Sequence, residues 1–217
     1  MYHDQQDCRK RLCIAGESTP SYMYDRNVPA RVHAVCPWMK MIVLLRDPMK
    51  RAQSHHNMLV AKNEINTKDF ERRLQNELDW MKKVGLVSKT TLSYEEEDEA
   101  WIKYQDHQKY WKLILGRGMY EIQLRLWFKY FPREQFLILK SEDLDHDRAT
   151  TMSRVYRFLG VPDQVLEKDE KVHTRNYSKP VLDKVQAILY DFYRPYNRRL
   201  ESLLGPEWKD VWERPSS

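Results

Sequence analysis

Residues that could bind an anion follow an apolar segment of the chain. The segment Met41–Leu45 has the length and β-branching of a buried strand, and Arg46 comes directly after it. Asp47 is favoured at a helix N-cap and Pro48 at the first helical position, so a helix is expected to begin there. Helix N-termini at the carboxyl ends of strands attract phosphates. Arg46 and Ser54, a residue two turns into the expected helix, are therefore candidates for a phosphate pocket.

The same pattern also fits a purely structural strand, capped turn and helix, in which Arg46 and Arg51 are solvated. A family resemblance favours the binding role. The string LLRDPMKRAQSHH, which begins at Leu44, resembles the 3′-phosphate-binding segment of sulfotransferases that use 3′-phosphoadenosine 5′-phosphosulfate (PAPS). The resemblance implies that Arg46 and Ser54 hold the 3′-phosphate of this nucleotide, which would serve as co-substrate.

Further stretches resemble the carbohydrate, heparan-sulfate-like sulfotransferases in the same order along the chain. They are GESTPSYMYD (16–25), GMYEIQLRLWFKYFPREQFLILKSEDL (118–144), TTMSRVYRFLGVP (150–162) and YDFYRPYNRRLESLLGPEWKDVW (190–212). The resemblance implies an α/β fold of the P-loop-kinase-like type, a three-layer parallel sheet with helices on both faces. It also implies a single domain over residues 1–217 that is partial at its amino terminus.

The pattern of apolar residues and helix breakers predicts the main elements. Strands alternating with helices favour a parallel sheet that is covered on both faces. A helix is expected from Thr67 to Lys83, and a long last helix that opens at Pro180 and breaks near Pro195. The acidic run 95–99 is interpreted as a solvated loop or a helix start. The expected strands are Leu12–Ala15, Met41–Leu45 and Phe136–Leu139.

Two further site residues follow from the resemblance alone. Arg175, in the basic loop 171–176, matches a loop that contacts the 3′-phosphate in the family, although a solvated loop arginine fits equally well. Glu17 matches the glutamate before the family's Thr-Pro pair and is the catalytic candidate. Its alternative role is to cap the turn that follows it. His55 and His56 are possible bases, but surface or core positions on a helix are equally expected for them.

Composition narrows the partners. The net charge of +5 and a pI near 9.0 favour acidic partners. No nucleic-acid-binding signature accompanies the basic residues, so an anionic nucleotide and a carbohydrate are expected as partners, and no nucleic acid.

The 3 cysteines have no zinc-binding spacing, so no metal is expected. No transmembrane segment or signal peptide is present in this sequence, so the chain as written is expected to be soluble. The family resemblance implies the Golgi lumen if an anchor precedes this sequence.

The Gly-rich loop that holds the 5′-phosphosulfate in the family has no counterpart among the 6 glycines. We therefore expect the chain to lack the front of the fold, with an unpaired edge at Met41–Leu45. The expected function is transfer of a sulfuryl group from PAPS to a hydroxyl or amine of a carbohydrate, with little turnover by this chain alone. The alternative is a non-catalytic protein that binds a nucleotide or an anionic glycan.

Overall fold

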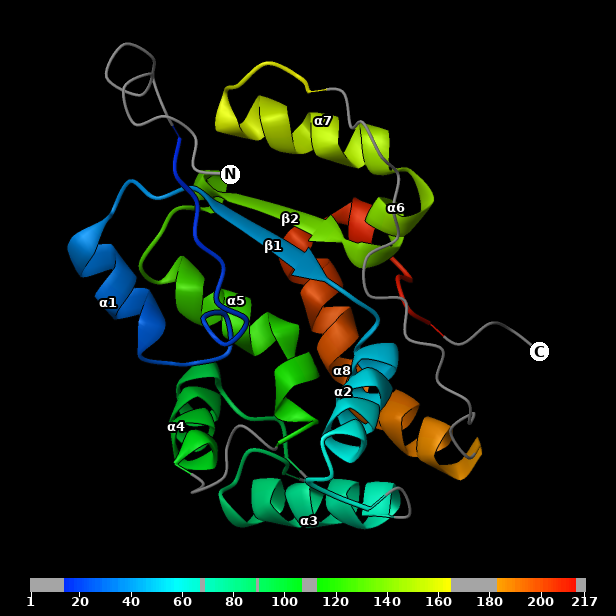
Figure 1. Cartoon of the computed structure of the whole chain (residues 1–217). Helices are drawn as coiled ribbons and strands as arrows, with labels where there is room; N and C mark the ends of the chain where they lie inside the picture. Colours follow the sequence, from blue (N-terminus) through cyan, green and yellow to red (C-terminus); the bar gives the residue numbers. More distant parts are fainter. Residues whose placement is uncertain (1–13, 67–68, 89, 107–112, 165–182, 214–217) are drawn as a thin grey trace.

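A two-stranded parallel sheet lies at the centre of the computed structural model (Figure 1). The structure describes residues 14–66, 69–88, 90–106, 113–164 and 183–213. Strand β1 (Met41–Leu45) pairs with β2 (Phe136–Lys140) in a register that runs from Met41 opposite Phe136 to Leu45 opposite Lys140. Both of these strands were predicted from their apolar runs. Ile14 and Ala15, the described half of the first expected strand, belong to no strand.

Helices lie on both faces of the sheet, as the predicted α/β class requires. Helices α5 (Tyr120–Phe128) and α8 (Asp183–Leu204) lie on one side of the strands, and α7 (Arg148–Leu159) lies on the other (Figure 1). Side chains alternate between the faces of a strand, so Val43 and Ile138 both point toward the α5–α8 side. This side forms one hydrophobic cluster, in which Trp127 of α5 and Leu200 of α8 are buried.

A second hydrophobic cluster lies between the helices that follow β1. Helices α2 (Pro48–Ala61), α3 (Phe70–Lys83) and α4 (Tyr94–Gln105) enclose it together with part of α8. Its fully buried members include Leu74, Met81, Trp101 and Tyr104. The helix predicted to end at Lys83 is confirmed as α3, while Thr67 and Lys68 lie outside the described residues.

The remaining elements are short and connect these layers. They are α1 (Val28–Val35), α6 (Ser141–His146) and the 3₁₀ turns η3 (Gly116–Gly118), η4 (Arg133–Gln135) and η5 (Pro206–Trp208). The turn η3 precedes α5 and packs against α2.

The predicted break of the last helix at Pro195 is wrong. Helix α8 runs from Asp183 to Leu204 with Pro195 inside it. Proline removes one backbone donor, which leaves the carbonyl of the residue four positions earlier without its helical partner. That residue is Asp191, and both it and Pro195 are exposed, so water can hydrate the carbonyl while buried Tyr193 and Leu200 hold the helix on either side.

The acidic run 95–99 does begin a helix, but it is only partly solvated. Ser93 caps α4 through a capping box with Glu96, as its position before the run allows. Glu97 is only 3% exposed and binds Arg125 and Arg199. The expectation of a solvated segment is therefore wrong for Glu97, because cations from α5 and α8 compensate its burial.

Candidate anion-binding cleft

A cleft of about 670 Å³ opens at the carboxyl end of β1. Its walls come from the loop before α1, the end of β1, one face of α2, the turn η3 and the start of α5. The lining residues are Pro20, Ser21, Met23, Tyr24, Leu44, Leu45, Arg46, Arg51, Ser54, His55, Met58, Arg117, Tyr120 and Gln123. Open α/β sheets bind ligands at this edge, so the cleft lies where the sequence placed the site.

Arg46 and Ser54, the two predicted phosphate ligands, line this same cleft. Arg46 is exposed at the end of β1, and its carbonyl accepts a 2.9 Å hydrogen bond from the hydroxyl of Tyr120. Asp47 caps α2 by accepting from the backbone N–H groups of Met49 (2.8 Å) and Lys50 (3.3 Å), as predicted. The capped turn fixes the start of α2 relative to β1, so Arg46 at the end of the strand and Ser54 on the helix both line the cleft.

Arg51 lines the cleft but is tied to the protein rather than solvated. One guanidinium nitrogen, Nη2, donates to the carbonyl of Ile114, just before the turn η3. The other, Nη1, lies 3.5 Å from Nδ1 of His55, one helical turn further along α2. Arg51 therefore joins α2 to the turn, a role that its spacing along the sequence did not indicate.

His55 lies beside a group of cations. Burial, the largest cause, and the nearby cations Arg51, Arg117 and Arg73 together lower the pKa of His55 from 6.5 to about 3. The imidazole is therefore neutral near pH 7. His56, its neighbour, is buried and stacks on Phe70 with ring centroids 4.2 Å apart, and such a core position was among those expected for it.

Arg117 is a site residue that sequence reasoning missed. It lies in the turn η3, and its Cζ atom is 4.4 Å from the ring centroid of Tyr24, which also lines the cleft. The available signal was local: an arginine between two glycines inside the otherwise apolar stretch 113–120. Only the tertiary structure brings that stretch against α2 and the loop before α1.

The other two predicted site residues are not among those that line the cleft. Glu17 is exposed and accepts a hydrogen bond from the hydroxyl of Thr19, which fits its alternative role in the turn. Its catalytic role stays a prediction. Arg175 lies outside the described residues.

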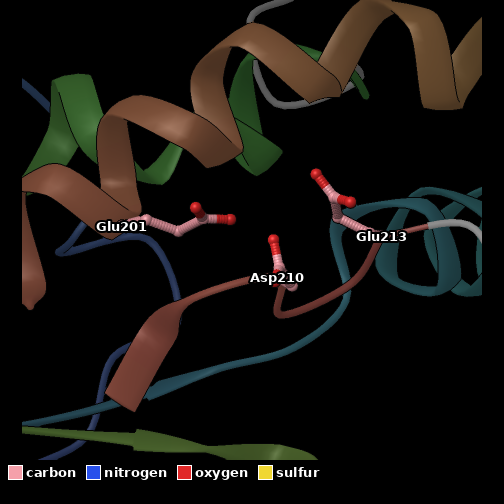
Figure 2. Close-up of side chains that lie close together, drawn as sticks. All are labelled: Glu201, Asp210 and Glu213. Carbon is pink, nitrogen blue, oxygen red and sulfur yellow. The ribbon is translucent and has the colours of Figure 1, made fainter. Parts of the chain in front are cut away.

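Carboxylates gather at a separate place, near the end of α8. Oxygen atoms of Glu201, Asp210 and Glu213 lie within 4.8 Å of one another (Figure 2). Burial raises the pKa of Glu201, and the nearby Asp210 raises it further. Clusters of this kind are common on protein surfaces without an ion, and we assign no metal to this one.

A search of the described residues finds no helix with the length and apolar character that a bilayer-spanning segment needs.

The layered sheet with a cleft at the carboxyl end of a strand, lined by Arg46, Arg51 and Arg117, defines an open α/β fold with a basic cleft. Comparison with known proteins identifies the family to which the chain belongs. The sequence model of the sulfotransferase domain matches residues 30–189, and the chain belongs to this family.

Curated relatives include human carbohydrate sulfotransferase 15 and human heparan sulfate glucosamine 3-O-sulfotransferase 6. The first is 27% identical over 94% of this chain and 40% of the relative, and the second is 28% identical over 90% and 56%. The chain thus spans about half the length of these relatives. The crystal structure of a sulfotransferase from Alicyclobacillus acidocaldarius matches with a TM-score of 0.64 and 21% identity, over 87% of this chain and 65% of that one. This last match confirms the fold.

Proposed function

We propose that this chain binds the 3′-phosphate of PAPS through Arg46 and Ser54, as part of a sulfotransferase that acts on a carbohydrate hydroxyl or amine. The observation that carries the proposal is the meeting of these two residues in one cleft at the carboxyl end of β1. A guanidinium offers paired donors to a phosphate, and a serine hydroxyl adds a third. The names of the curated relatives support a carbohydrate acceptor.

The nucleotide assignment is tested by thermal melts with adenosine 3′,5′-bisphosphate and with AMP. The bisphosphate should raise the melting temperature more than AMP, because only it carries a 3′-phosphate. Arg46→Ala should abolish the difference, since a charge-assisted contact is worth about 1.5–3 kcal/mol. Arg72→Gln, which removes a cation that is 71% exposed on α3, is the matched control and should keep the difference. Equal stabilisation of the wild-type chain by both nucleotides would refute the assignment.

Catalysis needs groups that the described part of the cleft does not provide. None of the residues that line it is Asp or Glu. The neutral imidazole of His55, with a pKa of about 3, is too weak a base to deprotonate a hydroxyl or amine near pH 7. We therefore expect this 217-residue chain to transfer little sulfuryl group from PAPS to heparan- or chondroitin-type acceptors in a radiolabel assay. Robust turnover would contradict this expectation.

A further inference from the structure

We infer that Arg117 is a second anion contact of the cleft, which binds an oxyanion group of a ligand whose 3′-phosphate lies at Arg46, or of the acceptor beside it. The inference deepens the proposed function and rests on it for the identity of the nucleotide. The oxyanion has two possible sources, the 5′-phosphate side of the nucleotide and a carboxylate or sulfate of an acidic acceptor. Both present the same chemistry to a guanidinium.

The exposure of the segment 113–120 singles out Arg117. The other seven residues of this segment are buried, while Arg117 is half-buried and lines the cleft. An arginine whose only role is to be solvated would not need to lie in a segment whose other residues are all buried. The chain here is held inside the protein and presents one cation to the cleft.

The backbone of the turn is fixed by buried side chains from three helices. Glu77 of α3 accepts from the N–H groups of Ile114 (2.6 Å) and Gly116 (3.0 Å). Tyr193 of α8 donates to the carbonyl of Leu115 at 3.0 Å, and Gln123 of α5 donates to that of Gly116 at 2.9 Å. These bonds fix the position from which the Arg117 side chain leaves the backbone, which is the preorganisation that a binding residue requires.

Both glycines of the turn are needed for close packing. A Cβ atom at Gly116 would lie 2.4 Å from the Tyr104 hydroxyl, and one at Gly118 would lie 2.7 Å from the Tyr193 ring. Neither tyrosine can move easily, because both are fully buried. The Gly-Arg-Gly sequence therefore places an arginine where its two neighbours in the chain must be glycine.

Tyr24 orients the guanidinium. The Arg117 Cζ atom lies 4.4 Å from the Tyr24 ring centroid, and Tyr24 in turn packs edge-on against Trp101 at 5.7 Å. A cation–π contact of this kind restricts the positions that the guanidinium can take at the cleft. Arg46 and Arg117 both line the cleft and come from different elements, so their guanidinium groups can contact two separate anionic groups of a ligand.

Binding titrations with three probes at one fixed salt concentration test the inference. The probes are adenosine 3′-monophosphate, adenosine 3′,5′-bisphosphate and a chondroitin sulfate hexasaccharide. Arg117→Gln should weaken binding of the bisphosphate or of the hexasaccharide by about tenfold or more, while binding of the 3′-monophosphate changes little. A loss confined to the bisphosphate identifies the nucleotide as the source, and a loss confined to the hexasaccharide identifies the acceptor. Arg117→Lys, which keeps the charge but not the planar group, should lose less than Arg117→Gln.

Arg72→Gln is the matched control for general surface charge. The inference is overturned if Arg117→Gln binds all three probes as Arg72→Gln does, or if the wild-type chain binds none of them. If Arg117→Gln does not fold, Arg117→Lys is compared with the wild type instead. Wild-type affinity of that variant for every probe would refute the claim that the planar guanidinium of Arg117 contacts the ligand. A failure of the proposed function is distinguishable, because it would appear as an unchanged nucleotide selectivity in Arg46→Ala while Arg117→Gln still weakens hexasaccharide binding.

Discussion

Glu77 shows how one residue can support a site without touching a ligand. Its carboxylate is buried at 5% exposure and accepts from the Tyr104 hydroxyl (2.6 Å) as well as from Ile114 and Gly116. Burial raises the pKa of Glu77, and these donors oppose the rise. Both oxygens are used, so an amide in their place would turn its NH₂ group toward a donor.

Glu77→Gln should therefore destabilise the chain by about 1–3 kcal/mol, the cost of one unsatisfied buried donor. Urea unfolding measures the loss. Glu71→Gln, on the same helix, removes a carboxylate that is 43% exposed and paired with Lys184, and it should cost less than about 1 kcal/mol. Equal losses in the two variants would show that Glu77 does not anchor the turn.

His55 gives the stability of the chain a defined pH dependence. Its pKa in the folded state, about 3, lies below its usual value of 6.5, so the unfolded chain takes up the proton first as the pH falls. The contribution of His55 is fully present above pH 6.5 and is lost progressively as the pH falls toward 3. One proton contributes a slope of at most about 1.4 kcal/mol per pH unit. His55→Gln should flatten this part of the curve of unfolding free energy against pH. An unchanged curve would show that His55 does not cause this pH dependence.

At the scale of elements, an ion network joins α4, α5 and α8. Arg125 of α5 binds Glu97 (2.7 Å), Asp98 (2.6 Å) and Glu121 (3.2 Å), and Arg199 of α8 binds Glu97 and Glu121. The side chains of Glu97 and Glu121 are only 4% and 2% exposed. Carboxylates that are buried to this degree depend on their cations, since removal of one partner leaves a charge uncompensated.

Arg125→Met should accordingly cost about 3–5 kcal/mol of unfolding free energy, measured by urea denaturation. The comparison is Lys129→Met, which removes the 51% exposed partner of Asp98 and should cost no more than about 1 kcal/mol. A small loss in Arg125→Met would mean that water or rearranged side chains compensate the carboxylates.

The elements that could be predicted from the sequence are those specified by neighbouring residues. The strand β1, the Asp47 cap and the spacing of Arg46 and Ser54 are all local, and the structure contains them. The burial of Glu97 could not be predicted, because Arg199 lies 102 residues away along the chain. Arg117 was missed for the same reason: its partner Tyr24 is distant in sequence and meets it only in the folded chain.

At the scale of the whole molecule, one face of the sheet is only partly covered. Ile42 and Leu44 lie opposite Leu137 and Leu139 in the parallel register and therefore share a face with them. Helix α7 packs against β2 on this face (Figure 1). The side chains of Ile42 and Leu44 remain 44% and 47% exposed. In the described part of the chain, β1 pairs with β2 and no described strand pairs with its other edge. An apolar strand with an open edge favours association between chains.

Ile42→Thr should therefore raise the concentration at which the chain begins to aggregate, with little change in its melting temperature. Threonine keeps the β-branched shape that suits a strand and removes exposed apolar surface. Ile138→Thr is the matched control on the buried face, where the side chain is only 5% exposed. It should cost about 2 kcal/mol or more, because it buries a hydroxyl and leaves a cavity. Light scattering and thermal melts on both variants separate the two effects. If Ile42→Thr destabilises the fold as much as Ile138→Thr, then the Ile42 face is packed in solution, and the exposed surface of β1 is not the cause of association.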